Sequence, residues 1–397
     1  MKFVLWKHYR WVILFIGVLS QITFAIGFAG IPASAIIMRN SYKFSMEQLG
    51  LVLGCMGLGV ALSEIIWGIL TDKLGDKIVL IAGLVLMGIT YLIISLLFTP
   101  IYDLIPKYWS LGGLLIIAGA VGGSINSSSG RAVMTWFQEN ERGFAMSIRQ
   151  TAIPIGAAFG VLLIPYTSLN YGYKISFIIL SIICFIASLC AYIFMSELKS
   201  EVSKNIKTEN QTNLFKNKKI WKIALAGGAL TFPQMAILSF SSIFLSDKYH
   251  LDIIITSYIS FIIQLGGGCL RIIAGKVSDK YKNRKKIISL IAIVAGIAAL
   301  TIGLIPVQNS YFIIFLLIIL GLFGNAWHGI GYTEIAISSG SQYAGRALGV
   351  MGTTVFTTSF LVTFIIPFII KYLSWNSVWV ITGVISLLAV PLIKEKK

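Results

Sequence analysis

Charged residues are scarce in this chain. They make up 12% of its 397 residues, whereas soluble domains carry about 25%. Acidic residues are the rarer kind, with 15 Asp and Glu against 32 Lys and Arg, and 57% of the chain is hydrophobic. Too few polar side chains are present to cover soluble domains of this total length, which argues against a soluble globular enzyme. The composition indicates that lipid is the solvent of this protein.

Several chemistry-bearing patterns are also missing. The nucleotide-binding loop Gly-x-x-x-x-Gly-Lys-Ser/Thr does not occur, which argues against an ATP-driven function. The sequence shows no pair of acids, metal cluster or nucleophile with a nearby base at membrane depth, so we expect no enzyme, no metal and no cofactor. Four cysteines in apolar stretches match neither a zinc site nor a redox motif and are interpreted as packing residues: Cys55, Cys184, Cys190 and Cys269.

Long apolar stretches dominate what is present. A membrane helix needs about 20 apolar residues, and twelve such stretches fit within the length. The first is too long for the core of a signal peptide and is expected to stay as a span. We predict spans at 11–37, 47–70, 78–98, 109–136, 144–169, 173–195, 220–245, 252–275, 287–306, 311–337, 347–370 and 376–393.

The basic residues support this count. With both termini in the cytoplasm, 22 of the 32 lysines and arginines fall in cytoplasmic segments, 6 in external segments and 4 within or at the edge of spans. Lys and Arg resist translocation across the membrane. A missed or invented span would assign all later loops to the wrong side and would remove this bias. We therefore attribute most of the net charge of +17 to the orientation of the spans in the membrane, and not to binding of nucleic acid. A bacterial inner membrane, with both termini cytoplasmic, is the expected location.

The chain contains an internal repeat. The segment Gly68–Lys73 after the second span recurs as Gly275–Lys280 after the eighth, and the polar segment 196–219 reads as a cytoplasmic linker between the two copies. Parallel repeats predict two bundles related by a pseudo-two-fold axis along the membrane normal, with a site between them near the midplane. The expected organisation is an all-α protein with a six-helix bundle at 1–195, a linker at 196–219 and a second bundle at 220–397.

The loop after the second span carries a recognisable motif. Gly68, Asp72, Lys73, Gly75 and Lys77 follow the pattern of the major facilitator superfamily, which this chain resembles over essentially its whole length. An acid, Asp76, replaces one of the usual basic residues. The resemblance implies a secondary transporter with a small-molecule substrate, in which these loops latch the cytoplasmic side. Gating is therefore expected of Asp72, Lys73, Asp279 and Lys280, and a merely solvated loop is the alternative.

Arg271, in the eighth span, is the first candidate for the site. An ionisable group at membrane depth is energetically costly and therefore indicates a functional role. A guanidinium suits a carboxylate because it donates two parallel hydrogen bonds to it. Its surroundings resemble the oxalate/formate antiporter and monocarboxylate transporter branch, where an arginine holds the substrate carboxylate. Gln264 lies seven residues earlier on the same face. Substrate contact and a structural ion pair both stay open.

Glu64 and Arg149 are further ionisable candidates in the first half. Glu64 lies 207 residues before Arg271, the offset of the repeat. It is interpreted as a counter-ion of Arg271, as a proton carrier, or as a polar packing contact. Arg149, in the fifth span, is a second candidate for holding an anion.

Three other positions complete the candidate gate and coupling groups. Arg131, near the cytoplasmic end of the fourth span, is expected to be a gate or loop anchor. Glu334 is expected to pair with Arg131 or with Arg149. His328 is a candidate for coupling or for orienting substrate, because histidine titrates near neutral pH. Polar side chains that either orient a ligand or bond a neighbouring helix are Gln21, Asn126, Gln150 and Gln234.

These features predict a monomeric transporter, embedded in the lipid bilayer, that carries a small organic anion of the carboxylate class. Coupling would be by proton symport through Glu64 or His328, or by anion exchange. The alternative is a proton-coupled multidrug or metabolite exporter of the same fold. The fifth span reads Ala152-Ile-Pro-Ile-Gly-Ala-Ala-Phe-Gly160 and lacks the Gly-Pro-x-x-Gly-Gly motif of drug antiporters, which disfavours that alternative.

Overall fold

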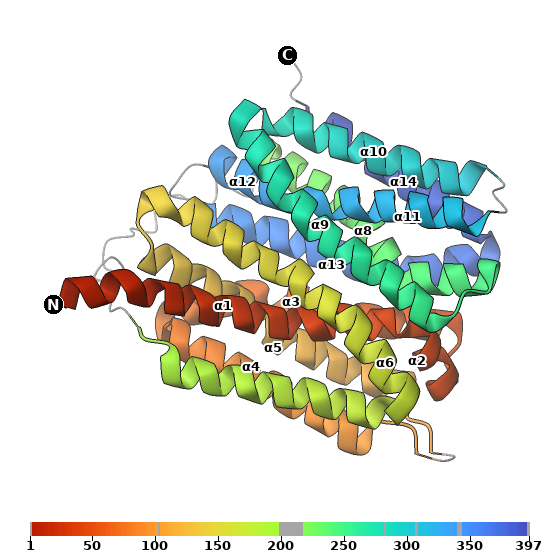
Figure 1. The fold of residues 1–397 in the computed structure, drawn as a ribbon, viewed down its shortest axis with the longest axis horizontal. Coiled ribbons are helices and arrows are strands. Elements are labelled where there is room, and N and C mark those ends of the chain that lie inside the picture. Colours follow the sequence, from red (N-terminus) through yellow and green to blue (C-terminus); the bar gives the residue numbers. More distant parts are fainter. Residues whose placement is uncertain are drawn as a thin grey trace.

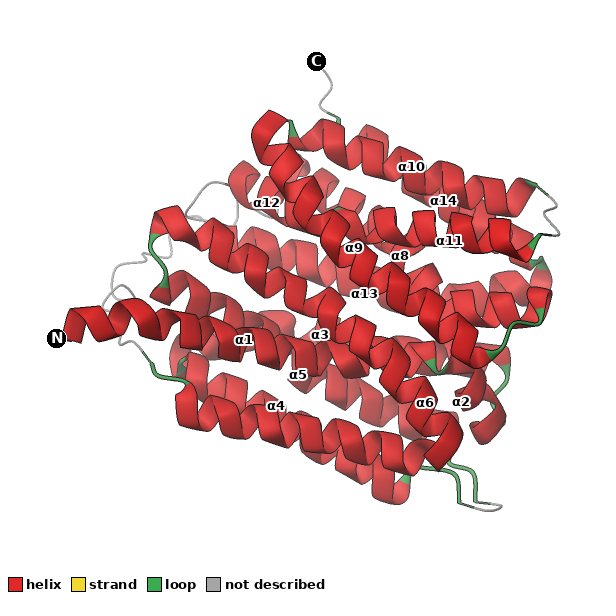
Figure 2. Ribbon diagram, viewed as in Figure 1, coloured by secondary structure: helices red, strands yellow, loops and turns green. Residues whose placement is uncertain are grey.

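The computed structural model describes residues 2–101, 104–197, 217–281, 283–305, 309–339 and 344–394. Within these ranges the chain is built of helices (Figures 1 and 2). Most of the predicted linker, 198–216, lies outside the described residues. The helices are α1 (Lys2–Ala33), α2 (Ala35–Tyr42), α3 (Met46–Leu74), α4 (Asp76–Leu97), α5 (Tyr108–Trp136), α6 (Glu139–Phe194), α8 (Lys218–Tyr249), α9 (Ile253–Tyr281), α10 (Arg284–Leu304), α11 (Ser310–Ala326), α12 (His328–Ser339), α13 (Ala344–Tyr372) and α14 (Trp375–Ile393).

Eleven helical segments among the described residues are long and apolar enough to cross a membrane. One of them, Ile148–Phe194, has 47 residues and would be about 70 Å long if straight, more than twice a hydrocarbon core of about 30 Å. Its helix bends at Gly172, where φ is 77°. This segment covers most of the fifth predicted span and all of the sixth, so each of the twelve predicted spans lies mostly on a helix.

Two glycines allow the sharp changes of direction between helices. Gly75 ends α3 and precedes α4 with φ at 91°, a conformation that residues with a Cβ rarely adopt. This explains physically why the motif of the second loop carries a glycine at this place. Gly172 does the same between the two halves of α6.

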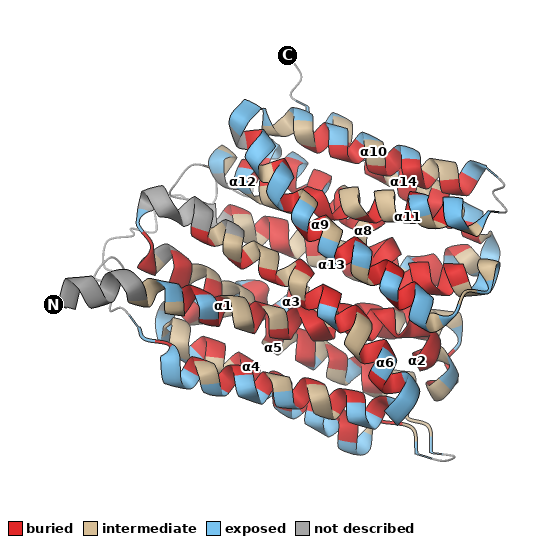
Figure 3. Cartoon of the chain, in the orientation of Figure 1, coloured by how far each residue is buried: buried red, intermediate tan, exposed pale blue. Residues whose placement is uncertain are grey.

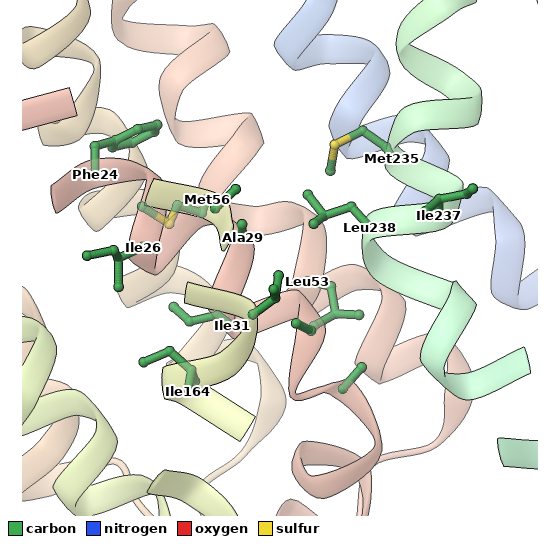
Figure 4. Close-up of a cluster of buried hydrophobic side chains, with 14 of the residues drawn as sticks. Phe24, Ile26, Ala29, Ile31, Leu53, Met56, Ile164, Met235, Ile237 and Leu238 are labelled. Carbon is green, nitrogen blue, oxygen red and sulfur yellow. The ribbon is translucent and has the colours of Figure 1, made fainter. Parts of the chain in front are cut away.

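The helices before and after the linker occupy opposite halves of the view in Figure 1. Helices α3 and α13, α6 and α9, and α1 and α8 pack against each other across this boundary. One buried hydrophobic cluster crosses it, with Leu53 and Met56 of α3 on one side and Met235 and Leu238 of α8 on the other, as labelled in Figure 4. Figure 3 shows exposed residues along the outer faces of the peripheral helices. Many exposed side chains are large and apolar; Leu97, for example, is 70% exposed. That distribution fits a bilayer as solvent.

Close helix packing depends on glycine at positions 119, 156 and 160. A Cβ at Gly119 of α5 would collide with the Met56 backbone of α3. A Cβ at Gly156 would lie 2.5 Å from the Ile22 carbonyl oxygen of α1, and one at Gly160 would collide with the Ile26 carbonyl. These backbones approach each other only because the side chain is missing.

Candidate functional site

Arg149 is the centre of a polar network in the first half of the chain. It lies on α6 and is 3% exposed. Its Nη2 donates to the carbonyl oxygen and to Oδ1 of Asn126, both at 2.7 Å, and its Nε donates to Ser129 Oγ at 3.0 Å. Gln21 Nε2 donates to Asn126 Oδ1 at 3.4 Å and to Ser129 Oγ at 3.3 Å. The structure thus brings together three of the predicted side chains, from α1, α5 and α6.

Glu64 joins the same network from α3. Asn126 Nδ2 donates to its Oε1 at 2.6 Å, so one amide bridges the guanidinium of Arg149 and the carboxylate of Glu64. The other oxygen, Oε2, is buried without a hydrogen-bond partner. It faces α13, where a Cβ on Gly352 would lie 2.7 Å from it. Glu64 therefore reaches across the boundary between the two halves.

Arg271 occupies a different environment on α9. It is 4% exposed, its Nε donates to the Asn325 carbonyl at 3.1 Å, and its Nη1 donates to the Gln150 carbonyl at 3.3 Å. The ion pairs found in the described ranges do not include Arg271. The interpretation of Glu64 as its direct counter-ion is therefore wrong for this structure. Within the described ranges, the hydrogen-bond partners of this buried cation are these two carbonyl groups.

Three residues of α11 and α12 surround Arg271. Asn325 Oδ1 accepts from Gln234 Nε2 at 2.9 Å, which ties α11 to α8. The His328 ring lies 6.2 Å from that of Tyr332, nearly parallel to it, and interacts electrostatically with Arg271. Tyr332 lies within electrostatic range of Glu64, Arg149 and Arg271. The sequence prediction missed Tyr332, although it follows His328 by four residues and so shares its helix face.

Two predicted site residues contribute differently from expectation. Gln150 reaches Arg271 through its backbone carbonyl, which needs no glutamine side chain. Gln264 is buried on α9 at 4% exposure, but no hydrogen bond joins it to either arginine among the described residues. A role for these two side chains in binding stays a prediction.

The ion pairs at the predicted cytoplasmic end differ from those expected. Arg131 Nη1 donates to the Thr71 carbonyl at 2.5 Å and to Asp76 Oδ1 at 3.3 Å. Glu334 pairs with Lys285 at 3.9 Å, so the prediction that it pairs with Arg131 or Arg149 is wrong. Asp76, the acid that departs from the motif, is the first residue of α4 and anchors Arg131 there. The reason is geometric: Arg131 and Asp76 belong to neighbouring helices of the same half.

The remaining gate candidates are less informative. The side chains of Asp72 and Asp279 lie outside the described part of the structure. Lys73 and Lys280 are exposed, and Lys280 Nζ lies 5.6 Å from the centre of the Tyr281 ring. A gating role for these four residues therefore stays a prediction.

Replacing Arg131 by methionine should destabilise the protein modestly. The change removes a partly exposed ion pair and leaves the Thr71 carbonyl without this donor, which together amount to about 1 kcal/mol. We expect Tm in detergent to fall by about 2–4 °C, measured by thermal unfolding. The exposed Lys174, replaced by methionine, serves as the control and should leave Tm in place. An unchanged Tm for Arg131→Met would show that the contact is not formed.

Two ion pairs lie at the opposite, predicted external end. Glu47 Oε1 of α3 is 2.6 Å from Lys371 Nζ of α13, and Asp247 Oδ1 of α8 is 3.8 Å from Arg39 Nη2 of α2. Both pairs join a helix before the linker to a helix after it. The sequence prediction did not identify them, because nothing in the local pattern indicates which loop ends meet.

Comparisons with known proteins were made for the whole chain. The sequence profile described as Major Facilitator Superfamily matches residues 13–363. An uncharacterized MFS-type transporter of Mycobacterium tuberculosis is 25% identical over 92% of this chain and 82% of its own length. The hexuronate transporter of Bacillus subtilis is 23% identical over 68% of this chain and 64% of its own length. The crystal structure of a D-xylose-proton symporter superposes with a TM-score of 0.80 at 16% identity, covering 97% of each chain.

Proposed function

Because the chain belongs to the Major Facilitator Superfamily of transporters, we propose that it carries a small organic anion of the carboxylate class across the membrane. It is a multi-pass integral membrane protein, and the family works by secondary transport without enzymatic chemistry. Arg271 and Arg149 hold the anion in this proposal. Asn126, Gln21, Gln150, Gln264 and His328 orient it.

The observation that supports an anionic substrate is that no acidic residue in the described part of the chain forms an ion pair with Arg271. A buried guanidinium without an acid nearby is energetically costly, and carbonyl oxygens offset only part of that cost. A carboxylate would complete the neutralisation through charge-assisted hydrogen bonds. The likeness to a hexuronate transporter supports the same substrate class, because a hexuronate is a sugar that carries a carboxylate.

The mechanism we propose is a rocking motion of two six-helix bundles, residues 1–195 and 220–397, about the buried cluster. Arg149 and Glu64 belong to the first bundle and Arg271 to the second. Motion of one bundle against the other would therefore expose the cluster to one side of the membrane at a time. Glu64 faces Gly352 across the boundary, which would let the motion change its access to water. This position supports Glu64, with His328, as a candidate for proton coupling, and anion exchange is the other mode.

Uptake into proteoliposomes tests this proposal. The purified protein is reconstituted and offered labelled monocarboxylates, sugar acids, the corresponding neutral sugars and a lipophilic cation, with and without an imposed pH gradient. Saturable uptake of the acids, with no uptake of their neutral analogues, is expected. Uptake restricted to the cation would support the exporter alternative and contradict the anion proposal.

The ion pair between Glu47 and Lys371 should influence the opening of the predicted external end. Both side chains are partly exposed, so we expect Glu47→Lys to change the rate of uptake by roughly fivefold or less. The double variant Glu47→Lys with Lys371→Glu restores opposite charges and should recover the rate. Equal rates in the single and double variants, both different from wild type, would contradict a role for the pair itself.

A further inference from the structure

The charges around the buried cluster can be counted. Arg149 and Arg271 supply two positive charges and Glu64 one negative charge. The titratable groups that interact with them within the described ranges are Tyr332 and His328, both on α12. We treat Tyr332 as a neutral phenol and His328 as a neutral imidazole, because a second cation beside the buried Arg271 would be costly. While Glu64 is a carboxylate, these charges sum to +1, and a proton on Glu64, as in the coupling proposed above, would raise the sum to +2.

The single negative charge is shared unequally between the two arginines. Asn126 links Glu64 to Arg149 through two hydrogen bonds of 2.6 and 2.7 Å, so this half of the cluster is close to neutral. Among the residues that the structure describes, Arg271 donates to the carbonyl oxygens of Asn325 and Gln150 and forms no ion pair. The uncompensated positive charge therefore lies on the Arg271 side.

We propose that this site selects its substrate by valence, an inference that rests on the function proposed above. The site accepts monovalent organic anions and disfavours divalent ones. The negative charge of Glu64 sets that limit. A monoanion bound at Arg271 brings the buried charge to zero. A dianion leaves one net negative charge, close to Glu64, in a site with little water. A neutral solute leaves the positive charge of Arg271 uncompensated.

The amides of the cluster fit the uncharged part of such a substrate. Asn126 on α5 lies on the Arg149 side, and Gln234 with Asn325 lies on the Arg271 side. These groups both donate and accept hydrogen bonds, as hydroxyl or carbonyl groups of a ligand require. A short hydroxylated monocarboxylate therefore matches the chemistry of both sides.

Competition between matched anions tests the valence limit. Hydroxylated monocarboxylates and dicarboxylates of equal chain length compete with a labelled monocarboxylate for uptake, at about pH 7.5 on both sides of the membrane, where both classes are ionised. We expect wild-type protein to bind the monocarboxylate at least about tenfold more tightly. Glu64→Gln raises the fixed charge to +2 and is expected to shift the ratio of the two inhibition constants by at least about tenfold towards the dicarboxylate.

Two variants serve as controls. Glu64→Asp keeps the charge and is expected to keep the preference, whereas Asp252→Asn removes an exposed acid from the start of α9 and is expected to leave the ratio unchanged. A wild-type preference for dicarboxylates overturns the proposal by itself, so the test does not depend on the folding of Glu64→Gln. An unshifted ratio in a folded Glu64→Gln also overturns it. Failure to take up anions of either valence would count against the proposed function instead.

Discussion

Arg271→Ala is expected to reduce the affinity for the transported anion by about 100-fold or more. Hydrogen bonds to charged groups contribute about 1.5–3 kcal/mol each, and the guanidinium can donate two of them to one carboxylate. Every 1.4 kcal/mol corresponds to a tenfold change in affinity. Arg271→Lys keeps the charge but loses the planar fork, so an intermediate loss of about tenfold is expected. Equilibrium binding in detergent measures this effect without contributions from the opening of either side.

Lys276→Ala provides the matched control for this prediction. Lys276 lies on the same helix as Arg271 but is exposed, so its replacement removes a positive charge without touching the buried cluster. We expect wild-type affinity. Should Arg271→Ala bind the anion as tightly as wild type while remaining folded, the substrate does not contact this guanidinium, and only the family assignment would stand.

Gly119→Val is expected to prevent stable folding or to lower Tm by at least about 5 °C. The added Cβ would collide with the backbone of Met56, and a backbone cannot turn aside as a flexible side chain can. Overpacking typically costs about 1–3 kcal/mol and sometimes more, and a β-branched residue leaves few rotamers for relief. Fluorescence-detected size-exclusion chromatography and thermal unfolding measure the loss.

The control for this change lies on the same helix. Gly113 has no atom within 4 Å of the position where its Cβ would be, so Gly113→Val adds the same atoms to α5 at an exposed site. It should behave as wild type. Equal stability of the two variants would contradict the close approach of α3 and α5, and a loss in both would point to helix propensity instead of contact between helices.

Composition and local pattern suffice to predict the helices. About 20 apolar residues are needed wherever a chain crosses a bilayer, because its backbone must bond to itself in lipid. That constraint acts within each segment, so the twelve spans can be predicted without knowledge of the packing. The need for glycine at position 75 is also a local property, because the tight turn between α3 and α4 requires a positive φ there. Arg271 and Glu64 stand out for a similar reason, because charges in apolar segments are rare.

The partners of these charges depend on the tertiary structure. Glu64 and Arg271 match by the repeat offset, yet Glu64 accepts from Asn126 and Arg271 donates to carbonyl oxygens. Asp76 looks like a flaw in the motif but binds Arg131, and Glu47 meets Lys371 from more than 300 residues away. Such pairings follow from how far each helix is rotated and shifted against its neighbours. Packing between helices sets those quantities, and no local pattern of residues encodes them.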